Sequence, residues 1–165
     1  DSLLYSHIID RAAELATPVL YASAATDLKS DAEALDILMP RRSLLAQTHS
    51  QRNDTSLILR YRNPRLSILL TGDAEAGSEE DLLQTPARLV STVLKVPHHG
   101  SKSSSSPALL AAVQPQYALN SAHSENRFGH PHSEVVDRYA ENDIPLFNTG
   151  DFGDIRLSTL LSPSS

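Results

Sequence analysis

Two short apolar runs in this sequence each stop at residues that can bind a metal ion. The run Leu66–Thr71 leads into Asp73, and the run Val90–Val96 leads into His98 and His99. Apolar runs of this length, bounded by glycine or proline, are typical of buried strands. In α/β sheets, the residues at the ends of such strands form ligand sites. The pattern predicts a sheet with a carboxylate and two imidazoles at neighbouring strand ends.

The composition restricts which donors a metal site can use. The 165 residues include no cysteine, so disulfides and thiolate ligands are excluded. Histidine, aspartate and glutamate remain, and these donors suit zinc, manganese or iron. With 40% hydrophobic residues the chain can bury a core. We expect one domain over residues 1–161, followed by a frayed tail over 162–165.

The charge balance bears on possible partners. The net charge of -6 gives no support to strong nucleic-acid binding, which usually requires a basic face. The basic residues that do cluster are Arg41 and Arg42, and Arg60 with Arg62 and Arg65. No apolar run approaches the roughly 20 residues of a membrane span, so a soluble segment is expected.

Periodicity and turn residues predict the order of the elements. Helices are expected over Leu3–Leu15, from an N-capping Ser78 through Leu83, over Pro107–Val113, and over Glu134–Glu141 with Ser133 as the N-cap. Strands are expected over Val19–Ala25, Ala34–Met39, Ser56–Tyr61, Leu66–Thr71, Val90–Val96, Tyr117–Ser121, Ile144–Thr149 and Ile155–Leu160. The expected connections are Thr26–Asp31, Ser43–Asp54, an antiparallel hairpin turn over Arg62–Arg65, and a terminal turn over Gly150–Gly153.

Four motifs occur in order along almost the whole chain. They are Asn53-Asp54-Thr55-Ser56, Leu69-Leu70-Thr71-Gly72-Asp73 with the following Glu79–Leu83, Leu94-Lys95-Val96-Pro97-His98-His99-Gly100-Ser101, and Asn126-Arg127-Phe128-Gly129-His130-Pro131. In combination they resemble the metallo-β-lactamase-like domain at the C-terminal end of ComEC, the membrane channel protein of bacterial DNA uptake. Any one of these motifs alone would be a weak signal.

The resemblance implies an α+β fold, the metallo-β-lactamase-like αββα sandwich, and metal-dependent hydrolysis of DNA. It implies that Asp73 bridges two divalent ions, zinc or manganese. It also implies that one of His98 and His99, together with His130, matches the later metal or active-site histidines, so the candidate metal ligands are Asp73, His98, His99 and His130. Asp73, His99 and His130 are the expected catalytic residues. The implied partners are DNA and a membrane channel portion, which would make the chain an extramembrane domain of a bacterial inner-membrane protein.

One departure from the family pattern is large. Superfamily members begin their site with a HxHxDH or HxDxDH loop, and no such spacing occurs in this sequence. The sequence therefore resembles the C-terminal portion of the domain and is expected to need an upstream half. Half of a sandwich leaves one apolar sheet face uncovered, so we expect the isolated chain to be inactive and to self-associate.

The residue chemistry leaves alternatives open. Adjacent histidines on a strand point to opposite faces, so His98 and His99 share a site only if the backbone turns at once, which Gly100 permits. One is then a metal ligand or substrate contact, and the other orients it or bonds a carbonyl. His130 is a ligand or a proton donor to the leaving group. The alternatives are an Asp73 that caps a helix and histidines that are ordinary loop residues.

Two further residues are expected to contact substrate. Ser101 opens a serine-rich segment ahead of the helix from Pro107, where hydroxyls and backbone amides could hold a phosphate. A flexible serine linker is the alternative. Asn126 of the fourth motif is the second expected substrate contact. Asn53 and Asp54 are expected to be structural, and no chemical role is assigned to the other histidines, His7, His49, His123 and His132.

Three functions are compatible with the sequence. The first is a metal-dependent hydrolase of DNA phosphodiesters. The second keeps the fold and metals and acts on a small ester, lactone or phosphate. The third is a non-catalytic remnant or assembly module, which the missing HxHxDH loop favours.

Overall fold

The computed structural model of the chain describes residues 3–19, 27–40 and 55–158. The strands are β1 (Asp27–Lys29), β2 (Ala34–Met39), β3 (Ile58–Arg62), β4 (Ser67–Leu70), β5 (Val93–Lys95), β6 (Tyr117–Asn120) and β7 (Leu146–Asn148). The helices are α1 (Leu3–Glu14), α3 (Ala76–Leu83), the single 3-10 turn η2 (Pro97–Gly100), α4 (Pro107–Val113), α5 (Ser133–Glu141) and α6 (Thr149–Phe152).

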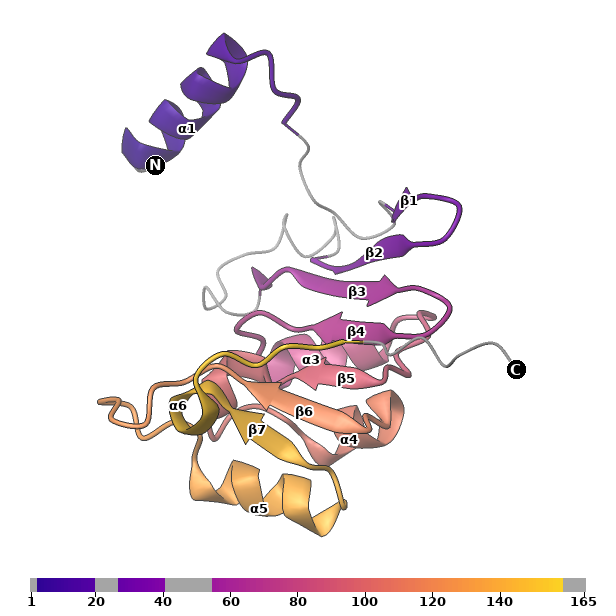
Figure 1. Ribbon diagram of the computed structural model, residues 1–165, viewed down its shortest axis with the longest axis vertical. Helices are drawn as coiled ribbons and strands as arrows, with labels where there is room; N and C mark the ends of the chain where they lie inside the picture. Colours follow the sequence, from indigo (N-terminus) through magenta and orange to yellow (C-terminus); the bar gives the residue numbers. More distant parts are fainter. Residues whose placement is uncertain (1–2, 20–26, 41–54, 159–165) are drawn as a thin grey trace.

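The strands form one mixed sheet in the order of the sequence (Figure 1). Strands β1 to β4 are antiparallel to their neighbours, whereas β4 to β7 are parallel. Each parallel connection needs a crossover, and α3, α4 and α5 supply these crossovers in turn. The carboxyl ends of β4, β5, β6 and β7 therefore lie at the same edge of the sheet, on the left in Figure 1.

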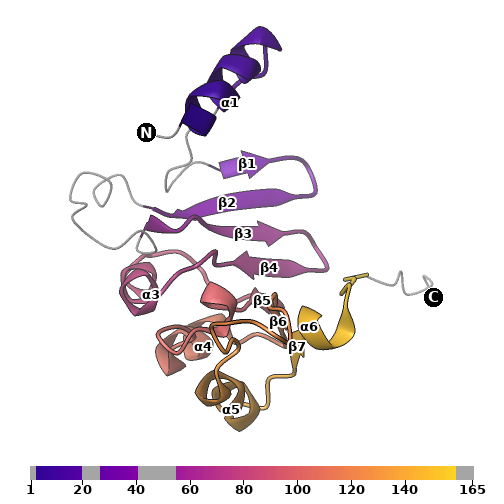
Figure 2. The same cartoon turned by 90° about the vertical axis from the view of Figure 1, so that its left-hand side faces the viewer.

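The core lies between the sheet and helices α3, α4 and α5, which cover one of its faces (Figure 2). Leu69, Leu94 and Ala118 are neighbours in register across β4, β5 and β6, and each is 0% exposed. Buried helix residues complete the cluster: Leu82, Leu109, Leu110, Val113, Val135 and Tyr139. Burial of each leucine contributes about 1.5–3 kcal/mol, so this face holds the parallel half of the sheet on the helices.

The opposite face of the sheet is less covered. Side chains alternate along a strand, so the neighbours of the core residues point to this face. Leu28, Leu70 and Tyr117 are large side chains with 48%, 38% and 45% of their surface exposed. The segment 153–158 runs across the middle of this face (Figures 1 and 2). The expected self-association through this face stays a prediction.

Helix α1 confirms the predicted amphipathic helix and stands apart from the sheet in both views (Figures 1 and 2). Among its described apolar side chains, Ile8 is 57% exposed, and Leu15, just past the helix, is 59% exposed. None of the helices in the described ranges combines the length and apolar character that crossing a bilayer requires.

Several predicted boundaries are wrong. The connection over Thr26–Asp31 contains strand β1, which pairs with β2 after a turn closed by the bond from Ser30 N to Glu33 O. Helix α3 begins at Ala76, two residues before the predicted N-cap Ser78, and Glu75 is its N-cap residue. His132 is the N-cap of α5, one residue before the predicted Ser133.

The C-terminal prediction also differs from the structure. The residues Gly150–Gly153 include the helical turn α6 instead of a hairpin turn. Gly150 packs against the loop after β6, since a Cβ there would lie 2.5 Å from Ser124 N. Residues 155–158 form no strand, and the rest of Ile155–Leu160 lies outside the described residues.

The predicted strand over Val19–Ala25 and the loop over Ser43–Asp54 fall almost wholly outside the described residues. Helix Pro107–Val113 and strand Ala34–Met39 are confirmed with their predicted bounds. The α+β class is also confirmed, as one mixed sheet with helices. The finer expectation of an αββα sandwich stays a prediction.

Candidate functional site

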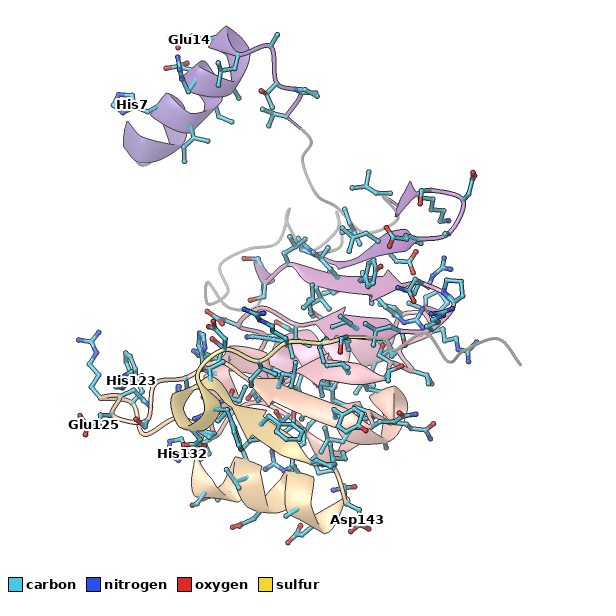
Figure 3. The ribbon with its side chains drawn as sticks, viewed as in Figure 1. His7, Glu14, His123, Glu125, His132 and Asp143 are labelled. Atoms are coloured by element: carbon cyan, nitrogen blue, oxygen red, sulfur yellow. The ribbon has the colours of Figure 1, made fainter. Side chains whose placement is uncertain are left out.

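Three loops at the carboxyl edge of the sheet carry the predicted site residues. The loop 71–75 follows β4, the turn η2 follows β5, and the loop 121–132 follows β6. Since these strands are parallel and adjacent, their loops lie side by side. Figure 3 labels His123, Glu125 and His132 at this end of the molecule. Asp73, His98, His99 and His130 therefore belong to one region, as the sequence pattern predicts.

The histidine turn η2 leaves strand geometry immediately after β5. His98 and His99 both have positive φ, at 44° and 55°, and Gly100 follows with φ 80°. Successive non-glycine residues in the left-handed region are strained and persist only where the surroundings hold them. The expected turn therefore occurs at the histidines themselves, and Gly100 completes it. Both imidazoles can then reach the same loop edge.

His99 is held by the loop after β6 and faces Asp73. Its Nδ1 donates to the carbonyl oxygen of Ser121. That bond fixes the tautomer, so the neutral ring has its lone pair on Nε2, which lies 3.4 Å from Asp73 Oδ1. Two electron-rich atoms at this separation are stabilised by a proton or a cation shared between them. The predicted bond from an imidazole to a carbonyl is therefore made by His99, and the predicted ligand or substrate contact stays a prediction.

His98 pairs with a carboxylate that the sequence reasoning missed. Its buried Nδ1 lies 3.0 Å from Glu75 Oε1, although the alignment is too poor for a hydrogen bond. The rings of His98 and His99 are edge to face at 6.4 Å between centroids, and the rings of His98 and His130 at 5.8 Å. Glu75 follows Asp73 by two residues, so its spacing was the available signal.

Lys95 places a cation beside Asp73. Its Nζ donates to the carbonyl of Gly72 at 2.7 Å and lies 3.9 Å from Asp73 Oδ1. Burial lowers the pKa of the Lys95 ammonium, and the Asp73 carboxylate opposes that shift. The amine therefore anchors the turn that presents Asp73 and offsets part of its charge.

His130 sits in a group of aromatic rings. Its ring stacks on Phe128 at 5.7 Å between centroids and lies 5.8 Å from the ring of His132. Burial, followed by the neighbouring imidazoles of His98, His132 and His99, lowers the pKa of His130. The neutral ring therefore prevails near neutral pH. His132, for which no role was predicted, belongs to this group.

Asn126 organises the loop that carries His130. Its side-chain oxygen accepts from the backbone N–H groups of Phe128, at 3.1 Å, and His130, at 3.0 Å. Its amide nitrogen donates to the carbonyls of His123 and His130. Because all of these partners are backbone groups of its own loop, the predicted contact with substrate stays a prediction.

Replacing Asn126 by alanine should loosen this loop. We expect Asn126→Ala to speed amide exchange at Phe128 and His130 and to lower the free energy of unfolding by about 1–3 kcal/mol. Hydrogen exchange and thermal melting measure these effects. Asn126→Asp keeps the acceptor oxygen and loses the donor, so it should fall in between. A variant that weakens substrate binding while the loop keeps its protection would instead support the substrate role.

Ser101 is tied into the turn. Its N–H donates to the carbonyl of His98 at 2.9 Å, and its hydroxyl lies 3.1 Å from that of Ser103. The segment is therefore bonded to the histidine turn, unlike the flexible linker that was the alternative. A phosphate contact by Ser101 stays a prediction.

Two arginines of the predicted basic cluster, Arg60 and Arg62, bond to groups within the sheet and its connections. Arg60 is 9% exposed, and its guanidinium donates to the carbonyl of Val90 at 2.8 Å. Arg62 pairs with Asp36 at 3.0 Å. The polar hollow of about 350 Å³ nearby is formed by residues 29–34 and 62–64, at the opposite edge from the histidines. Arg41 and Arg42 lie outside the described residues.

Across the described ranges, no three histidine, aspartate or glutamate side chains are arranged together as a set of metal ligands. The arrangement consists instead of two imidazole–carboxylate pairs, His99 with Asp73 and His98 with Glu75. Two neighbours of these pairs were missed: Lys95 lies within the third motif and His132 directly follows the fourth, and these places were the available signals.

Comparison with known proteins identifies relatives for this arrangement. No protein-family model matches the chain. "ComE operon protein 3" of Bacillus subtilis is 34% identical over 107 residues, which is 65% of this chain. "Recombination protein 2" of Haemophilus influenzae is 36% identical over 64% of the chain, and "Competence protein ComA" of Neisseria gonorrhoeae 38% identical over 59%. The chain is related to the ComEC-type competence proteins.

The relation confirms the family resemblance drawn from the four motifs. The matched region is 14% of the length of the Bacillus subtilis relative, 13% of the Haemophilus influenzae relative and 14% of the Neisseria gonorrhoeae relative. This chain therefore corresponds to a small part of a ComEC-type protein.

Proposed function

We propose that this ComEC-related chain supplies part of a metal-dependent hydrolase site that cleaves DNA phosphodiesters. The observation that carries the proposal is the position of Asp73 Oδ1, 3.4 Å from the Nε2 lone pair of His99. These residues come from loops after different strands, and His98 and His130 lie beside them. Competence relatives at 34–38% identity support a role connected with DNA.

The chemistry of the donors fits zinc or manganese. Carboxylate and neutral imidazole are the ligands that these ions accept when thiolates are absent. A metal-bound imidazole normally donates its other N–H to a backbone carbonyl or carboxylate, and His99 already donates to Ser121 in this way. Asp73, His99, His98 and His130 would hold the ions, with further ligands from the HxHxDH loop of an upstream half.

A divalent ion bound here would supply a hydroxide near neutral pH and neutralise charge on the phosphodiester. The chain's own groups would orient that chemistry. Asp73 would present its carboxylate from the turn anchored by Lys95, and the Ser121 carbonyl would keep the His99 lone pair directed at the site. His130 would contribute its neutral imidazole, because its pKa is lowered.

We further propose that the sheet is the C-terminal layer of a metallo-β-lactamase-like αββα sandwich. Helices α3, α4 and α5 cover one face, while Leu70 and Tyr117 on the other face remain partly exposed. An upstream half with its own sheet would cover that face. The partners of this chain would then be that half, a membrane channel portion, and DNA.

Metal analysis and nuclease assays on the natural full-length protein test the proposal. We expect bound zinc or manganese, cleavage of DNA when the metal is present, and loss of cleavage on chelation. Affinity for DNA should fall as salt rises, because a phosphate backbone releases counterions on binding. Metal-dependent cleavage of a small ester or phosphate with salt-insensitive affinity would favour the second function. Absence of metal and of any cleavage would favour the non-catalytic module.

A further inference from the structure

A buried carboxylate near the site takes no part in the proposed chemistry. Glu79 lies on α3, is 1% exposed, and accepts backbone N–H bonds from Ser105 at 2.6 Å and Ser106 at 2.8 Å. Hydrogen bonds to an ionised carboxylate are about twice as strong as neutral ones. Both oxygens of Glu79 are therefore committed to the serine segment that follows the histidine turn.

Helix α5 holds the same segment from its other side. Arg138 Nη1 donates to the carbonyls of Ser104 and Ser105 at 2.9 Å and 2.8 Å. The Ser105 hydroxyl lies 3.1 Å from that of Tyr139. Ser105 is fully buried with φ 59°, a conformation that a non-glycine residue keeps only when its surroundings fix it. Two helices thus hold this one strained residue.

The serine segment is bonded in turn to the histidine turn. The Ser104 hydroxyl donates to the carbonyl of Pro97 at 2.9 Å and to that of Ser101 at 2.8 Å. Ser101 N donates to the carbonyl of His98 at 2.9 Å. A continuous series of hydrogen bonds therefore connects Glu79 to the residues that carry the imidazoles.

We propose that Glu79 is a positioning residue, which holds the turn Pro97–Gly100 through the serine segment so that His98 and His99 face their carboxylates. The chemical purpose of this role rests on the proposed function, whereas the mechanical link does not. A carboxylate suits the role because two N–H donors require two acceptor oxygens. A glutamine side chain has one acceptor oxygen. Its NH₂ group would face the N–H of Ser105 or Ser106, and two donors cannot form a hydrogen bond with each other.

Hydrogen exchange followed by mass spectrometry tests the mechanical link. In Glu79→Gln, the amides of His98 and Ser101 should exchange about tenfold faster or more, the scale of a lost buried hydrogen bond. Strand β6 should keep its protection. The matched control is Glu80→Gln, the same change at the next residue of α3, which is exposed and should leave all of these amides unchanged.

A second variant cuts the link further along. Ser104→Ala removes both bonds of the hydroxyl, to Pro97 and to Ser101, and leaves in place the backbone bond from Ser104 N to Ser101 O and the bonds of Glu79. Faster exchange at His98 and Ser101, with Ser105 and Ser106 unchanged, is the expected result. This variant also decides the matter if Glu79→Gln loosens the whole domain. The proposal is overturned if exchange at His98 and Ser101 stays at the wild-type rate in Ser104→Ala.

The consequence for the site is measured with Zn²⁺ as the probe, in the natural full-length protein. Glu79→Gln should weaken Zn²⁺ binding about tenfold, as loss of groups that orient metal ligands does, while Glu80→Gln should not. Unchanged Zn²⁺ affinity in Glu79→Gln would overturn the positioning role at the site. If the wild-type protein binds no Zn²⁺ and cuts no DNA, the proposed function fails, and the exchange data still decide whether Glu79 holds the turn.

Discussion

Replacing Asp73 by asparagine should reduce metal-dependent DNA cleavage by at least about a hundredfold, the scale of losing one preorganised group at a reacting centre. Asparagine keeps the shape of the side chain and removes its negative charge. The His99 Nε2 lone pair would then face an amide at about the 3.4 Å that separates it from the carboxylate. The measurement is the initial rate of DNA cleavage with manganese or zinc in the natural full-length protein.

The control for this variant is Asp137→Asn, the same substitution at an exposed position on α5. It should leave cleavage and melting temperature unchanged. Metal content, measured in parallel, separates loss of binding from loss of turnover. Wild-type cleavage in Asp73→Asn would contradict the proposed role of the carboxylate and, with it, the proposed site.

Gly100→Ala should cost about 2–5 kcal/mol in the free energy of unfolding. An added Cβ would lie 2.6 Å from Pro131 Cβ and 2.9 Å from Pro131 Cα, and the residue has φ 80°. Overpacking costs about 1–3 kcal/mol, and an alanine in the left-handed region about 1–2 kcal/mol more. The carbonyl of Gly100 accepts from His132 N at 2.9 Å and so ties the histidine turn to the loop of Pro131. Relief of the clash would therefore also move His98 away from His130, whose rings lie 5.8 Å apart.

Gly153→Ala is the matched control, since Gly153 has φ 70° and no atom within 4 Å of an added Cβ. It carries the backbone strain without the clash. Denaturant unfolding of both variants should show Gly100→Ala less stable by about the overpacking term alone. Equal loss of stability in the two variants would mean that the loop of Pro131 moves away from the added Cβ at no cost. That loop would then not hold the histidine turn in place.

The sequence predicted those parts of the fold that local chemistry determines. Pro107 at a first helical position, with Ser106 before it, fixes the start of α4, and Pro40 fixes the end of β2. Strand β1 was missed because a three-residue edge strand of Asp27, Leu28 and Lys29 has no apolar alternation to reveal it. Its pairing with β2 decides its structure.

The candidate site was predicted to the extent that each donor ends an apolar run. Asp73, His98 and His99 met this condition, and the parallel arrangement of β4 and β5 brings them together. Glu75 and Glu79 did not, because their roles depend on which loops pack above α3. The left-handed backbone at both histidines was not predicted either. Glycine is the residue that usually adopts a positive φ, so the turn was expected at Gly100 alone.

The strained histidine turn has an evolutionary consequence. Glycine at position 98 or 99 would relieve roughly 1 kcal/mol of backbone strain at each. At position 99 it would also remove the hydrogen bond to the Ser121 carbonyl, which contributes about as much. The backbone at these two positions therefore gives no advantage to a histidine over a glycine. Relatives that keep both rings would be expected to use the imidazoles, and relatives that no longer use them would be expected to vary at both positions.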